Sequence, residues 1–128
     1  MIYSEEKYPL QKESYKVIGI CMEVHRILGK GLLENVYKDA LEYEFSKNNI
    51  LYEREKKFEV KYKEIILQHH YIADFIVFDK IILEVKAKSN VVEEHFAQVI
   101  NYLALSKCPL GLLVNFGDES LAYKRIIL

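Results

Sequence analysis

Apolar positions in the first third of the chain recur with helical spacing. In residues 14–28 they fall three and four apart and predict a helix with Ser14 as its N-cap. This helix is expected to end at Gly29, because glycine tolerates the left-handed conformation that closes a helix. Residues 32–47 repeat the pattern and precede two asparagines, a stop signal. The first third is therefore predicted to be a helical hairpin.

After residue 50 the pattern changes to that of β-strands. Residues 51–62 alternate apolar and charged side chains, which is typical of a strand with one exposed face. Residues 70–78 and 81–87 are almost continuously apolar, as in strands that are covered on both faces. The remaining elements are a helix over residues 91–106 and strands over residues 110–116 and 121–128. The predicted order, ααβββαββ, is that of an α/β protein.

Composition agrees with one folded domain over residues 1–128, with residues 1–13 as a less ordered N-terminal segment. Hydrophobic residues make up 51% of the chain and charged residues 29%, the balance of a soluble globular protein. No apolar run reaches the roughly 20 residues that cross a bilayer, and the N-terminus lacks a secretory signal, so we expect a cytoplasmic protein without membrane contact. Cys21 and Cys108 belong to no metal-binding motif and are expected to be reduced and buried.

The formal net charge of −1 argues against strong nonspecific binding of duplex nucleic acid, which usually needs a basic surface. A local basic groove remains compatible with this charge. The cations that would form it lie in one segment: Arg54, Lys56, Lys57, Lys61 and Lys63.

Three charges interrupt the two most apolar segments. Glu84 and Lys86 stand two residues apart in residues 81–87, so their side chains point to the same face of that strand. Asp74 is the single charge in residues 71–78. Charged groups in such strands are desolvated, and each needs a compensating partner.

The loop between these strands decides which charges meet. A loop of three residues, 78–80, puts Asp74 directly opposite Glu84, whereas a loop of two residues puts Asp74 opposite Val85 on the other face. We predict the three-residue loop, which places the two carboxylates side by side.

Two adjacent carboxylates in a low-dielectric site repel each other, and Lys86 offsets only part of this repulsion. A bound cation would resolve it, and oxygen ligands without histidine or cysteine suit Mg²⁺ or Mn²⁺. The alternative is structural: a partly buried Glu84–Lys86 ion pair, with Asp74 accepting backbone hydrogen bonds. The coincidence of three charges on adjacent apolar strands favours the metal site.

These residues resemble the core signature of the PD-(D/E)XK nuclease superfamily. Asp74 ends a Tyr-x-Ala-Asp stretch, with Ala73 in place of the usual proline, and Glu84-Val85-Lys86 follows after nine residues. Residues 31–37, GLLENVY, also resemble the pattern of the bacterial GxxExxY proteins, a branch of that superfamily. Further similar segments, within a resemblance that spans residues 18–127, are Val24-His25, Ala97-Gln98, Asn101-Tyr102-Leu103, Leu113-Val114-Asn115-Phe116-Gly117 and Lys124-Arg125-Ile126.

The resemblance implies a restriction-endonuclease-like fold, with a mixed central β-sheet flanked by helices. It also implies that Asp74 and Glu84 are metal ligands, that the backbone carbonyl of Val85 is a third ligand, and that Lys86 orients and activates the attacking water.

The resemblance adds two residues from helices. Glu34 would bind the metal directly or through water, although its position in the first helical turn also suits a solvated glutamate that interacts with the helix dipole. Gln98 would assist from the helix after residue 90, although it equally suits the flank of that helix.

The expected function is that of a divalent-metal-dependent nuclease that hydrolyses phosphodiester bonds of nucleic acid, with DNA as the expected partner. Because the domain is small, it has few elements with which to hold a polymer. A homodimer is therefore one expected arrangement. One alternative is a non-catalytic nucleic-acid-binding or regulatory module that retains the fold. Another is metal-dependent chemistry on a nucleotide or other phosphoester.

Overall fold

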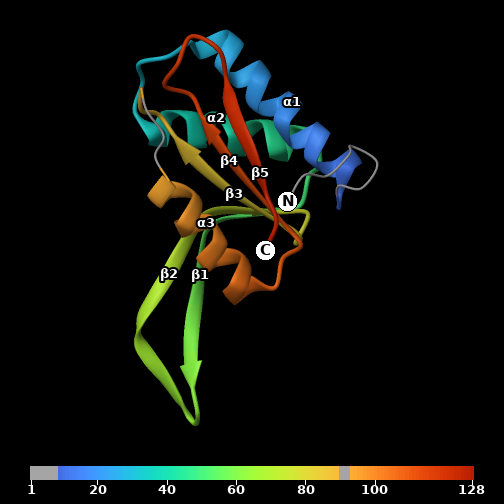
Figure 1. Cartoon of the computed structure of the whole chain (residues 1–128). Coiled ribbons are helices and arrows are strands. Elements are labelled where there is room, and N and C mark those ends of the chain that lie inside the picture. The colour runs from blue at the N-terminus through green and yellow to red at the C-terminus, as the bar shows by residue number, and fades with distance from the viewer. Residues whose placement is uncertain (1–8, 90–92) are drawn as a thin grey trace.

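The computed structural model describes residues 9–89 and 93–128, which form a mixed β-sheet between two helical layers (Figure 1). The elements are α1 (Gln11–Leu28), α2 (Glu34–Lys47), β1 (Tyr52–Tyr62), β2 (Ile65–Val77), β3 (Ile81–Lys86), α3 (Glu93–Ser106), β4 (Leu110–Asn115) and β5 (Ala122–Ile126). This order is the predicted ααβββαββ. Within the described residues no helix is long and apolar enough to cross a membrane.

The five described strands lie in the order β1-β2-β3-β4-β5. Neighbours are antiparallel except β3 and β4, which are parallel and are connected through α3. Helices α1 and α2 cover one face of the sheet and α3 covers the other (Figure 1). Each face has its own apolar core. Strand β3 contributes Leu83 and Val85 to the α1/α2 core and Ile82 to the α3 core, so its hydrophobic run is explained by burial on both sides.

The register between β2 and β3 is the predicted one. Val77 pairs with Ile81 and Phe75 with Leu83, with a three-residue loop, residues 78–80, between the strands. Regular pairing ends at Phe75 and Leu83, and the next residues along the two strands are Asp74 and Glu84. The predicted loop and register are confirmed, and hydrogen bonds to the backbone hold Asp74 and Glu84 next to each other just beyond the last regular pair.

Strands β1 and β2 continue beyond the body of the molecule as a long two-stranded hairpin, here called the arm, residues 56–73 (Figure 1). The arm leaves the sheet at Asp74. Its partner position in β1, Glu55, has a left-handed φ of 57°, and pairing is interrupted at these two residues. Ala73 and Phe75 should share a face, yet they belong to the cores on opposite sides of the sheet. Strand β2 therefore turns over at Asp74.

Several element boundaries differ from the prediction. Helix α1 begins at Gln11, and Ser14 lies inside it, fully buried, with its hydroxyl donating a 3.0 Å hydrogen bond to the carbonyl of Gln11. Ser14 is thus not the N-cap, because the helix starts one turn earlier, after Leu10. The expected less ordered segment, residues 1–13, lies outside the described residues as far as residue 8, and residues 11–13 are helical.

Strand β2 begins at Ile65, five residues before the predicted start. Its outer half is exposed on both faces, so it lacks the burial pattern on which the prediction depended. Helix α2 begins at Glu34 and not at residue 32, and the first two residues of the predicted third helix lie outside the described residues.

Candidate active site at the base of the arm

The two carboxylates of adjacent strands are tied together through the backbone. The amide of Asp74 donates a 2.8 Å hydrogen bond to Oε1 of Glu84, and the amide of Val85 donates a 2.8 Å hydrogen bond to Oδ2 of Asp74. Where β2 turns away from β3, hydrogen bonds from backbone amides to carboxylate side chains thus take the place of backbone–backbone hydrogen bonds between the strands. This satisfies the buried amides and fixes both carboxylates at the open end of the β2–β3 pair.

The environment of Glu84 disfavours its negative charge. The residue is only 2% exposed, and burial together with the nearby charge of Asp74 raises the pKa of Glu84 from 4.5 to about 8. Lys86 acts in the opposite direction and lowers this pKa, but only partly compensates. Without a bound cation, burial and the charge of Asp74 therefore favour the protonated form of Glu84.

Lys38 of α2 is a cation of the site that the sequence analysis did not identify. Its Nζ lies 2.9 Å from Oδ1 of Asp74 and 2.8 Å from Oε1 of Glu55, and its side chain is 7% exposed. Burial lowers the pKa of Lys38, but the hydrogen bonds to Glu55 and Asp74 outweigh it and leave this pKa above its usual value. Lys38 is therefore a charged ammonium between two carboxylates.

A sequence signal for Lys38 exists. The residue lies on the helical stripe formed by Glu34, Leu41 and Phe45, at spacings of four and three, and the latter two are fully buried. A lysine within such an apolar stripe needs an anionic partner. The sequence offers no means of choosing that partner, since Asp74 lies 36 residues away and Glu55 is one of several glutamates in β1.

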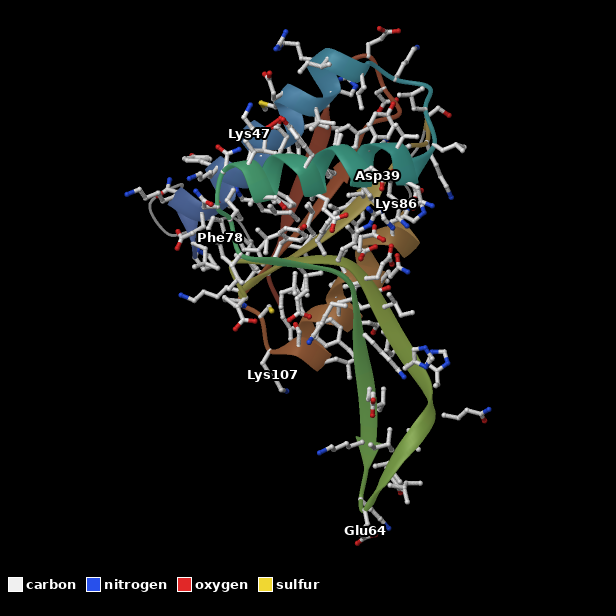
Figure 2. All side chains as sticks on the ribbon, turned by 180° about the vertical axis from the view of Figure 1, so that it is seen from behind. Asp39, Lys47, Glu64, Phe78, Lys86 and Lys107 are labelled. Atoms are coloured by element: carbon white, nitrogen blue, oxygen red, sulfur yellow. The ribbon has the colours of Figure 1, made fainter. Side chains whose placement is uncertain are left out.

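Lys86 follows Glu84 on the same face of β3 and is half-buried. Figure 2 shows it in the body of the molecule between α2 and α3, whereas Glu64 marks the distant tip of the arm. The structural alternative, a Glu84–Lys86 ion pair, is not present among the described residues. The other half of that alternative is present, because Asp74 does accept a backbone hydrogen bond.

Helix α3 brings Tyr102 and Gln98 to the site. The Tyr102 hydroxyl donates a 2.8 Å hydrogen bond to the carbonyl of Ile72, and burial together with the charges of Glu84 and Asp74 raises the pKa of Tyr102. Gln98 is half-buried and hydrogen-bonds the Tyr102 side chain. Gln98 therefore contacts Tyr102, which lies within the electrostatic influence of the two carboxylates.

Glu34 is the first residue of α2 and is half-buried. It lines a shallow hollow together with Leu33, Asn35 and Ala87, beside the end of β3. It makes no hydrogen bond or ion pair with Asp74 or Glu84 in the part of the chain that the structure describes. The structure thus places Glu34 near the end of the strand that carries the site but does not bring it into contact with the carboxylates.

The residues present fit a single hard divalent cation. Val85 donates its amide toward β2, and in a strand the amide and carbonyl of one residue point to the same side, so its carbonyl also points to the β2 side. Mg²⁺ takes one or two carboxylates and completes its octahedron with water and phosphate. Over the described ranges no group of three or more His, Cys, Asp or Glu side chains is arranged to hold a metal ion. Asp74, Glu84 and the backbone carbonyl of Val85 are the oxygen donors of this site that could hold such an ion.

A mixed sheet flanked by helices, with paired carboxylates on adjacent strands and a lysine two residues after the second, is the arrangement of a nuclease-type α/β fold. A sequence profile described as the PD-(D/E)XK nuclease superfamily matches residues 11–126, and the chain belongs to this superfamily.

A crystal structure titled as that of SSO0001 is similar, with a TM-score of 0.57 and 23% sequence identity. The match covers 92% of this chain and 59% of that one, so this chain spans little more than half the length of that protein. At this identity the similarity concerns the fold alone. No curated protein matches the chain.

Proposed function

We propose that the protein hydrolyses phosphodiester bonds of nucleic acid with the help of Mg²⁺ or Mn²⁺. The observation that carries this proposal is the pair of carboxylates, Asp74 and Glu84, locked to each other at the open end of two strands with Lys86 beside them. Burying two acids together is costly unless a cation is bound there for part of the working cycle. Membership of a nuclease superfamily supports this chemistry.

Asp74, Glu84 and the carbonyl of Val85 would hold the ion. When bound, the ion supplies a Lewis acid for the phosphoryl oxygen and lowers the pKa of a coordinated water. Lys86, on the same face as Glu84, would stabilise negative charge on the attacking water and the phosphate. Gln98 would act through Tyr102, whose hydroxyl holds the start of the arm at Ile72.

The arm offers a means of holding a polymer. Lys57, Lys61 and Lys63 are exposed along it and make no ion pair with any other described residue. By contrast, Arg54 is bound to Asp39 and Glu42, so it is not available to the basic groove that the sequence suggested. Three exposed ammonium groups on an arm that begins at the carboxylates support a nucleic acid as the substrate.

The chain's GLLENVY segment supports its assignment to the GxxExxY branch. Gly31 has a φ of 98°, which favours glycine. The hydroxyl of Tyr37, which is fully buried, donates a 2.6 Å hydrogen bond to the carbonyl of Gly29 and accepts one from the amide of Leu32. The glycine and the tyrosine of the pattern therefore shape the turn that leads into Glu34.

The test is cleavage by the purified chain in Mn²⁺ of single-stranded DNA, duplex DNA, RNA and free nucleotides. We expect cleavage that EDTA abolishes and that Glu84→Gln reduces about 100-fold or more, since it removes a metal ligand. Glu59→Gln, on the exposed arm, is the matched control and should retain activity. Equal activity of the Glu84→Gln protein would assign the cleavage to a contaminant and contradict the proposal.

One observation favours a second function, that of a non-catalytic nucleic-acid-binding module. Lys38 already neutralises Asp74, so the site is partly balanced without a metal ion. Calorimetric titration with Mn²⁺ separates the two. Binding that Asp74→Asn abolishes supports the hydrolase, whereas nucleic-acid binding without any Mn²⁺ binding supports the module.

A further inference from the structure

Lys38 occupies the place on Asp74 that a metal ion would need. One carboxylate oxygen, Oδ2, accepts the amide of Val85, and the other, Oδ1, lies 2.9 Å from the Lys38 ammonium. Each oxygen therefore has one partner already and only one further acceptor position. A divalent ion placed on Oδ1 would meet the positive charge of Lys38 at a few ångströms, where repulsion is strong in a poorly solvated site.

Glu55 gives the ammonium a second partner. Its Oε1 lies 2.8 Å from Lys38 Nζ, and its side chain is 50% exposed. The left-handed φ of Glu55 places this carboxylate opposite the point where β2 turns over. Lys38 can therefore leave Asp74 without becoming an unpaired buried charge, because Glu55 and the solvent beside it remain in reach.

The formal charges of the side chains around Lys38 agree with a site that takes up a divalent ion. Asp74, Glu84 and Glu55 carry three negative charges when all are ionised, and Lys38 supplies one positive charge. Addition of a divalent ion balances these four side chains.

We propose that Lys38 is an internal latch: in the metal-free protein it contacts both Asp74 and Glu55, it releases Asp74 and keeps Glu55 when a divalent ion binds, and it thereby sets the affinity of the site for the metal. The inference rests on the proposed role of Asp74 as a metal ligand. It assigns to Lys38 a positioning function in which the residue competes with the ion and takes no part in the reaction.

The experiment is calorimetric titration of the full chain with Mn²⁺. We expect Lys38→Met to bind Mn²⁺ at least about tenfold more tightly than the wild type, because the competing cation is gone. Lys56→Met is the matched control: it removes a lysine one residue from Glu55 that pairs with Glu53, and its affinity should stay within about threefold of the wild type. Unchanged or weaker binding by Lys38→Met would overturn the latch, as would a failure of every variant to bind.

Glu55→Gln tests whether Glu55 keeps Lys38 when the ion binds. This variant also tests the latch if Lys38→Met does not fold. Loss of the second partner should hold Lys38 on Asp74 and weaken Mn²⁺ binding several-fold, whereas tighter binding would contradict the latch.

Cleavage measured on the same proteins separates the latch from the proposed hydrolase activity. Tighter Mn²⁺ binding by Lys38→Met without any cleavage supports the latch and contradicts the hydrolase. Metal-dependent cleavage with an unchanged affinity contradicts the latch alone.

Discussion

At the scale of single residues, the site is a connected row of ionisable side chains that come from three elements. Lys38 of α2 contacts Asp74 of β2, and Asp74 is linked through backbone amides to Glu84 of β3. The most deeply buried member, Glu84, is the least able to ionise. Its protonation state should therefore depend on whether a cation is present.

This arrangement predicts an unusual pH dependence of stability. Between pH 4.5 and about 8 the folded protein holds a proton on Glu84 that the unfolded chain has released, so the free energy of unfolding should fall as the pH rises through this window. Glu84→Gln cannot ionise and should lack this component. Urea unfolding at pH 5, 6.5 and 8 in EDTA measures it, and parallel profiles for the two proteins would show that the pKa of Glu84 is not raised.

A bound ion should replace that proton. In Mn²⁺ the wild-type protein is therefore expected to lose less stability between pH 5 and 8 than it does in EDTA, because the cation stabilises the ionised carboxylate. The same comparison on Glu84→Gln is the control, since this variant has neither the proton nor the full ligand set. A wild-type profile that is identical with and without Mn²⁺ would contradict a metal site at Glu84.

At the scale of elements, the segment after β3 is held against the segment after β4. The amide of Phe116 donates a 2.8 Å hydrogen bond to the carbonyl of Lys86, and the Asn115 side chain hydrogen-bonds both backbone groups of Lys88. Gly117 lies so close to Lys88 that a Cβ atom there would overlap the Lys88 backbone. The end of β3, which carries Lys86, is thus positioned by this glycine.

Gly117→Ala should therefore destabilise the fold by about 1–3 kcal/mol, the usual range for overpacking, since the backbone of Lys88 has to move. Gly19→Ala is the control, and we expect it to change the stability in the opposite direction. Gly19 is exposed within α1, a Cβ atom added there would have no neighbouring atom within 4 Å, and alanine should stabilise the helix by about 0.5–1 kcal/mol. Thermal unfolding measures both, and a neutral Gly117→Ala would mean that the two segments are not in close contact.

At the scale of the whole molecule, the arm extends the reach of a small domain. Its apolar side chains nearest the body, Phe58 and Tyr71, pack against the α3 core, whereas Tyr62 and Ile65 near the tip are more than half exposed. The outer arm thus has little core of its own, and a lone hairpin is marginally stable in water. Its exposed lysines and its position beside the carboxylates suit contact with a polymer that passes the site.

Replacement of Lys57 and Lys61 together by alanine should weaken nucleic-acid binding and reduce the slope of log affinity against log salt by about one to two, as expected for the loss of two phosphate contacts. Cleavage of a short substrate that does not reach the arm should change little. Lys12 and Lys16, on the opposite helical layer, provide a matched double-alanine control. An unchanged salt slope in the arm variant would show that the polymer does not contact this part of the arm.

Local patterns along the chain were enough to predict the element order, the register of β2 against β3 and the pairing of Asp74 with Glu84. These features depend on periods of 3.6 and 2 and on a short loop, all of which are local properties. The arm was underestimated because residues 65–69 are exposed on both faces and lack a burial pattern. The contact between Lys38, Asp74 and Glu55 depends on the packing of α2 against the sheet and on the turn of β2 at Asp74. Such a contact joins residues that are distant in the chain, so only the tertiary structure reveals which anion the buried lysine meets.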